Sequence, residues 1–246
     1  MAPTSAPIKF AGSFLRGFRH VCAFFGSPED EYRAILPFTI EGLAAGERVV
    51  HVVSRDRRDH ADRLRAGGVD VDRGREHHQL ELLVSEQIYL VNHHFDPLAM
   101  MDLMEKILVS GRRLGFPLTR IVAHAEHVMQ DFERVDSFLE YESRLTDLLT
   151  DYPDPVVCTY DLDRVSAAVV VDVMRTHPMG IVGGILQGNP FYQRPEEFLR
   201  EMEVRRSKGS EVHSGSGERY SNIRRSGRVD LFGPDSSGSI SHGYEV

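Results

Sequence analysis

Two histidines and two cysteines belong to the residue types that bind soft metal ions. His20 and Cys22 alternate in a short, mostly apolar run, Cys158 lies in a second such run, and His177 comes directly before Pro178. Imidazole nitrogen and thiolate sulfur are ligands that Zn²⁺ prefers. None of the four stands in a C-x-x-C or H-x-x-x-H spacing, and a buried free cysteine is ordinary core packing. We therefore expect a small polar cluster that tunes a ligand pocket, and we predict no metal.

Other polar residues follow the ends of apolar runs. Ligands of open α/β folds bind at the carboxyl ends of parallel strands, where helix N-termini offer free backbone N–H groups. The candidates for ligand binding are Gly26, Ser27, Ser54, Glu126, His127, Tyr160 and Asp161. Each of these residues, taken alone, could instead have a purely structural role: Asp161 could cap a helix, and Glu126 could pair with an arginine. For the region as a whole, the pattern favours a pocket.

The remaining histidines and an E-Y-E triplet give no catalytic prediction. His124 and His127 are three residues apart, so on one strand they point to opposite faces and cannot share a metal. Glu140 and Glu142 stand at positions i and i+2, which do not face each other on a helix. At most one of these carboxylates points at a shared site, and no catalytic residue is predicted.

Alternating strands and helices must position these residues. Residues 20–25 and 49–53 read as buried strands. Between them, Ser27 is a helix N-cap, Pro28 a first-turn proline and Gly46 a stop signal. Further strands are predicted over residues 80–84, 119–128, 156–160 and 181–186, and helices over residues 56–66, 132–149 and 164–175 and from Asp96-Pro97 onward. This alternation predicts an α/β fold with a mostly parallel sheet and helices on both faces.

The loop after the first strand lacks the groups that hold phosphate. A P-loop reads G-x-x-x-x-G-K-[ST], whose glycines let the backbone wrap the phosphates and whose lysine neutralises them. Here the loop reads GSPEDEY, with three acidic residues and no lysine. The sequence therefore predicts a degenerate P-loop position.

Length and composition set the outer bounds. The chain has 246 residues, 41% of them hydrophobic, and a net charge of −8, which argues against nucleic acid as a partner. Two cysteines and the lack of a signal peptide or membrane span predict a soluble, cytoplasmic protein without a membrane partner. We expect a flexible leader over residues 1–13 and a folded domain over residues 14–202. In residues 203–246, 17 are Gly or Ser, which predicts a disordered tail.

The order of several segments resembles a known family. These segments are HVCAFFGSPEDEY, PFTIEGLAAGERVVHV, the E-Y-E triplet, VVCTYD, THPMGIVGG and NPFY. Together, over about residues 18–200, they resemble the MEDS domain, the DcmR-type sensory domain of prokaryotic signal transduction. More distantly, EGLAAGERVVHV resembles the KaiC and RecA-like ATPase scaffold. The resemblance implies a RecA-like three-layer fold in which the strands of Cys22 and Cys158 are neighbours.

The same resemblance implies sensing of small molecules, with simple hydrocarbon derivatives as the expected class. We expect a non-enzymatic sensor without a cofactor. No helix-turn-helix, kinase or ATPase segment follows residue 200, so the signal would pass through the tail or in trans to a protein partner such as a histidine kinase or a sigma-factor regulator. Two alternatives stay open: a nucleotide-binding RecA/KaiC-like ATPase with an atypical loop, and a metal-binding regulator that uses its Cys and His residues.

Overall fold

The computed structural model of the chain describes residues 7–15, 17–53, 57–84, 90–91, 94–125 and 132–207. Its strands are β1 (Ile8–Phe10), β2 (Ser13–Leu15), β3 (His20–Phe25), β4 (Arg48–Val53), β5 (Leu80–Val84), β6 (Leu90–Val91), β7 (His94–Phe95), β8 (Thr119–His124), β9 (Val156–Asp161), β10 (Met179–Val182) and β11 (Ile185–Gly188). Its helices are α1 (Pro28–Ala44), α2 (Arg57–Ala66), α3 (Val71–Glu76), α5 (Pro97–Arg113), α6 (Phe132–Leu148) and α7 (Ala167–Thr176), and residues 195–207 are also helical.

A seven-stranded sheet forms the centre of the first of two units, Met1–Met202 and Glu203–Val246. The strand order is β11-β10-β3-β9-β8-β4-β5, and every neighbouring pair is parallel except β10 and β11. In this order β3 pairs with β9, and Cys22 lies opposite Cys158 in the register. This confirms the prediction that the strands of Cys22 and Cys158 are adjacent in the sheet.

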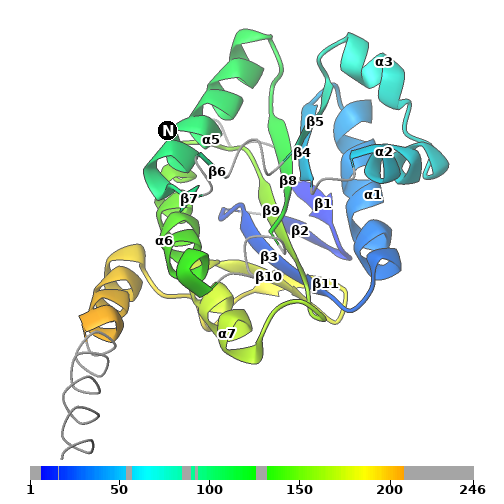
Figure 1. The fold of residues 1–246 in the computed structure, drawn as a ribbon. Helices are drawn as coiled ribbons and strands as arrows, with labels where there is room; N and C mark the ends of the chain where they lie inside the picture. The colour runs from blue at the N-terminus through cyan, green and yellow to red at the C-terminus, as the bar shows by residue number, and fades with distance from the viewer. Residues whose placement is uncertain are drawn as a thin grey trace, which may run out of the picture. The chain divides into compact units, whose positions relative to one another are not determined.

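Helices cover both faces of the sheet (Figure 1). Helices α1, α2 and α3 pack on one face, and α5, α6 and α7 pack on the other. The predicted three-layer α/β fold, a mostly parallel sheet with helices on both faces, is confirmed. None of the described helices combines the length and the apolar character that a membrane crossing requires.

The two faces of β3 have different partners because side chains alternate along a strand. Val21, Ala23 and Phe25 belong to the core beneath α1. Cys22 belongs to the larger core beneath α5, α6 and α7. His20 has the same parity as Cys22, so the strand directs both toward the second layer of helices.

The starts of two helices follow the predicted capping signals. The Ser27 hydroxyl accepts a hydrogen bond from the backbone N–H of Asp30, with Pro28 in the first turn of α1. Asp96 accepts from the N–H groups of Leu98 and Ala99 at the start of α5. These caps satisfy backbone donors that a helix leaves open, so α1 begins directly after the end of β3.

The ends of the chain differ in part from the predictions. Residues 8–10 pair with residues 13–15 in an antiparallel hairpin, and Phe10 packs on Phe38 with ring centroids 4.5 Å apart. The predicted leader over residues 1–13 is therefore wrong from residue 8 onward, because buried Ile8 and Phe10 anchor the hairpin. Residues 1–6 lie outside the described residues.

Two further boundaries also differ. The single strand predicted over residues 181–186 is a hairpin of β10 and β11, since Gly183 and Gly184 take positive φ angles and turn the chain. Residues 203–207, assigned above to the disordered tail, are helical, and the rest of that tail lies outside the described residues.

Candidate functional site

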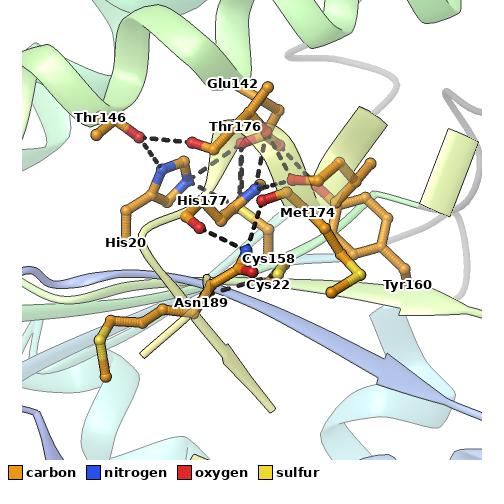
Figure 2. Close-up of polar contacts among 12 residues, drawn as sticks. His20, Cys22, Glu142, Thr146, Cys158, Tyr160, Met174, Thr176, His177 and Asn189 are labelled. Atoms are coloured by element: carbon orange, nitrogen blue, oxygen red, sulfur yellow. Dashed lines mark hydrogen bonds and ion pairs between the residues drawn. The ribbon is translucent and has the colours of Figure 1, made fainter. Parts of the chain in front are cut away.

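Four buried side chains meet beneath the second layer of helices (Figure 2). We call His20, Glu142, Cys158 and His177 the Glu142 cluster, because the Glu142 carboxylate is at its centre. Oε2 of Glu142 lies 3.1 Å from His20 Nε2, 3.3 Å from His177 Nε2 and 3.5 Å from Cys158 Sγ. Cys158 Sγ also lies 3.6 Å from His20 Nε2. Each of the four residues is at most 1% exposed, so the cluster is closed to solvent.

Four elements that are distant in sequence supply these side chains. His20 opens β3, Cys158 lies in the middle of β9, Glu142 is on α6, and His177 is the C-cap of α7. The β3–β9 pairing brings His20 and Cys158 onto neighbouring strands. The cluster therefore ties two central strands to two helices of one layer.

Burial and mutual contacts set the charges of the cluster. Burial and the neighbouring His177 lower the pKa of His20 to about 4. Burial alone would raise the pKa of Glu142, but its contacts with His177 and His20 outweigh that effect and hold the pKa at about 2. Burial and the Glu142 carboxylate raise the pKa of the Cys158 thiol well above its usual value. An ionised carboxylate thus lies beside a His20 imidazole and a Cys158 thiol that burial keeps neutral.

Three of the four residues predicted for the polar cluster meet here, and the fourth does not. The Cys22 thiol instead donates to the carbonyl oxygen of Met179 at 3.6 Å. It lines a neighbouring apolar pocket of about 380 Å³, formed by Cys22, Phe24, Met174, Gly180, Val182, Gln187, Gly188, Asn189, Pro190 and Phe191. Glu142 takes the place of Cys22 in the cluster, and the sequence reasoning had left Glu142 without a role.

A second pocket lies at the carboxyl ends of the strands, where the sequence predicted one. It measures about 220 Å³, and its lining includes Ser27, Tyr160 and Asp161 from the predicted set. Gly26 instead lines an adjoining pocket of about 610 Å³ beside the β1–β2 hairpin. Ser54, Glu126 and His127 lie outside the described residues.

Local structure explains the position of two of these residues. Asp161 accepts from the N–H of Asp163 at 2.9 Å and pairs with Arg164 at 3.2 Å, so its carboxylate organises the turn after β9. The Tyr160 hydroxyl donates to Oε1 of Glu142 at 3.1 Å, while its side chain also borders the pocket at the strand ends. Tyr160 therefore connects that pocket with the Glu142 cluster.

Three further histidines, which the sequence reasoning did not group, gather near the pocket at the strand ends. His51, His60 and His124 are buried, and their ring nitrogens lie within 4.8 Å of one another. His51 Nδ1 is 3.1 Å from His60 Nε2, and His124 Nδ1 is 2.9 Å from the Glu31 carboxylate.

Only weak signals in the sequence point to this group. His51 lies in the apolar run RVVHVV, and His60 lies in a helix that reads as a solvated face. The available signal was a single polar residue at a core position of a strand or helix, which indicates a buried polar contact.

Comparisons with known proteins support the family resemblance. Residues 19–178 match the family described as the MEthanogen/methylotroph, DcmR Sensory domain (MEDS). Among solved structures, the flagellar accessory protein FlaH from Methanocaldococcus jannaschii is similar, with 10% identity and a TM-score of 0.48 over 74% of this chain and 84% of that one. No curated protein sequence is significantly similar to the chain.

Proposed function

Since this chain belongs to the MEDS family of sensory domains, we propose that it is a non-enzymatic sensor of a small, mainly apolar molecule and signals through a protein partner. The observation that carries the proposal is the apolar pocket beside Cys22. Its volume of about 380 Å³ is in the range of small-molecule sites.

The lining of this pocket suits a neutral hydrocarbon derivative. Phe24, Met174, Val182 and Phe191 supply apolar and polarisable surface. Among the described lining residues, Asn189 and Gln187 carry side-chain amides, and a ligand with one hydroxyl, carbonyl or halogen would leave few buried polar atoms unpaired. No charged side chain is among the described residues that line the pocket, so an ionic ligand would lose its hydration without a counter-charge from them.

The wall of the pocket is connected to the end of α7. The Asn189 side-chain amide donates to the carbonyl oxygens of Met174 and His177, the latter at 2.8 Å. A ligand that displaces Asn189 would therefore bias the position of the α7 C-terminus. A sensor domain signals in this way: ligand binding shifts the equilibrium between two conformations, and the partner protein binds one of them more tightly.

The residues at the start of α1 favour the ATPase alternative less than the sensor proposal. Glu29, Asp30 and Glu31 occupy the first turn of α1, where a nucleotide phosphate would meet the helix N-terminus. We expect Mg²⁺-ATP at millimolar concentration to leave the thermal unfolding midpoint unchanged. A midpoint that rises with ATP concentration would support the ATPase alternative instead.

A substitution that narrows the apolar pocket tests the sensor proposal. A Cβ added at Gly180 would lie 3.5 Å from Cys22 Sγ, an ordinary contact, so Gly180→Ala keeps the fold while it takes space from the pocket. Short-chain alcohols, acids and halocarbons are first screened by thermal shift and calorimetry. We expect Gly180→Ala to weaken binding of the active compound by about tenfold or more, because one methyl group in an apolar pocket has effects of this size.

Gly26→Ala is the matched control. A Cβ at Gly26 meets no atom within 4 Å, and Gly26 lines the pocket beside the hairpin rather than the apolar pocket. Binding by Gly26→Ala should equal that of the parent. A panel without any binding compound, or a loss in Gly26→Ala alone, would contradict the proposal.

A further inference from the structure

The donor atoms of the Glu142 cluster are spaced as the ligands of one metal ion would be. Four pairs of these atoms, from His20, Glu142, Cys158 and His177, lie 3.1 to 3.6 Å apart. A tetrahedral Zn²⁺ site with nitrogen and oxygen ligands at about 2.0 Å and sulfur at about 2.3 Å has ligand atoms separated by about 3.3 to 3.6 Å. Four of the six separations therefore match those around one central ion, and all four donor atoms lie within 4.8 Å of one another.

The hydrogen bonds of His20 direct a lone pair at the cluster. His20 Nδ1 lies 2.8 Å from Thr146 Oγ1, and Thr146 Oγ1 donates its proton to the carbonyl oxygen of Thr176 at 2.9 Å. The hydroxyl has a single proton, so it must accept from His20 Nδ1–H. In a neutral imidazole the other nitrogen, Nε2, then has no proton and faces the Glu142 carboxylate with its lone pair.

His177 is oriented in the same way by a different partner. Its Nδ1 lies 2.8 Å from the carbonyl oxygen of Val173, which only accepts, so Nδ1 carries the proton. The Nε2 lone pair of a neutral His177 therefore also points at Glu142 Oε2, at 3.3 Å. A histidine that binds metal typically donates its other N–H to a carbonyl or another acceptor in this manner.

Two lone pairs and a carboxylate that converge in a closed space need a positive charge between them. His177 Nε2 is buried and makes no hydrogen bond within the part of the chain that the structure describes. A metal cation bound to all four side chains satisfies every group at once.

We propose that the Glu142 cluster is a closed binding site for one divalent transition metal, with Zn²⁺ as the ion that its donor set favours. His20 and His177 bind through Nε2, Glu142 through Oε2 and Cys158 through Sγ. The thiol must lose its proton to bind, so each metal ion that enters releases one proton to solvent. Tyr160, which donates to the other carboxylate oxygen, orients Glu142 without contacting the ion.

The burial of the site determines when the metal enters. All four ligands are at most 1% exposed, so the ion would be taken up as the chain folds and would exchange slowly afterwards. It would then link β3, β9, α6 and the end of α7. The site is separate from the apolar pocket, and it can be present whether or not that pocket binds a ligand.

The two cysteines of the chain provide a matched test. The full chain, without a histidine tag, is produced in cells supplied with Co²⁺, and its metal content and absorption spectrum are measured. We expect one cobalt per chain, a thiolate-to-cobalt charge-transfer band and the ligand-field bands of tetrahedral Co²⁺. Cys158→Ser should lose the charge-transfer band, whereas Cys22→Ser should keep both the band and the stoichiometry.

The outcomes are distinct. Absence of cobalt or zinc from the parent, or a band that survives in Cys158→Ser, would overturn the proposal. A band lost in Cys22→Ser but kept in Cys158→Ser would also overturn it. His51→Gln and His124→Gln report on the separate histidine group, and their metal content should equal that of the parent.

If Cys158→Ser folds poorly, a variant of the residue that orients His20 provides a second test of the metal site. Thr146→Val preserves the shape of the side chain but removes the acceptor of His20 Nδ1–H. We expect it to keep the charge-transfer band and to lose cobalt to a chelator about 10- to 100-fold more readily, the usual effect of removing such a partner. Loss at the parental rate would contradict the assigned role of Thr146.

Discussion

Replacing Glu142 with alanine is expected to lower the free energy of unfolding by about 3–5 kcal/mol. The carboxylate is 1% exposed and accepts hydrogen bonds from the Cys158 thiol and the Tyr160 hydroxyl, which are both buried. Truncation leaves these groups buried with fewer partners, and each unsatisfied group costs about 1–3 kcal/mol. If the cluster holds a metal ion, the loss of one ligand acts in the same direction.

Glu140→Ala is the control, because it removes the other carboxylate of the E-Y-E triplet from the same helix. Glu140 pairs with Arg144 at 3.0 Å at the surface, where such a pair contributes about 0.2–1 kcal/mol. Urea unfolding of the parent and both variants measures the difference. Equal losses in Glu142→Ala and Glu140→Ala would show that the cluster has no special role in stability.

Local signals in the sequence were sufficient to predict the framework of the fold. Ser27 with Pro28, and Asp96 with Pro97, are capping patterns whose effects depend on neighbouring residues alone, and both helices begin there. Alternating parity along residues 20–25 likewise predicted a buried strand. The hairpin of residues 8–15 was missed because two prolines and several small residues suggested a loose leader, whereas the burial of Ile8 and Phe10 depends on tertiary packing.

The candidate site could be predicted only in part. The family motifs grouped His20, Cys158 and His177, and the strand order that the resemblance implied put the strands of Cys22 and Cys158 side by side. Whether Glu142 or Glu140 reaches the cluster depends on how α6 is rotated about its axis. The amphipathic pattern of the helix does not determine this rotation closely enough to choose between two glutamates that are two residues apart. The group of His51 and His60 requires the contact between β4 and α2, for which the sequence offers no motif.

Acidification is expected to destabilise the protein through the histidines beside the pocket at the strand ends. Burial and the neighbouring His124 lower the pKa of His51 to about 3, and burial and His51 also lower the pKa of His60. In the unfolded chain the pKa of histidine is about 6.5. Between these values the unfolded state binds more protons than the folded state, so stability falls as the pH decreases from about 6.5 toward 3.

The contribution of His51 can be isolated by substitution. At pH 5, the difference between a pKa of about 6.5 and one of about 3 corresponds to a loss of about 2 kcal/mol relative to neutral pH. We expect His51→Gln to reduce the pH dependence of the free energy of unfolding by about this amount, measured by urea unfolding at pH 7 and pH 5 at constant ionic strength.

Thr39→Val is the matched control for this experiment. The Thr39 hydroxyl lies 3.0 Å from His51 Nε2, so the variant loses the same hydrogen bond as His51→Gln but keeps the imidazole. It should be less stable than the parent at both pH values and keep the parental difference between them. If His51→Gln also kept that difference, His51 would not be the group whose protonation weakens the fold.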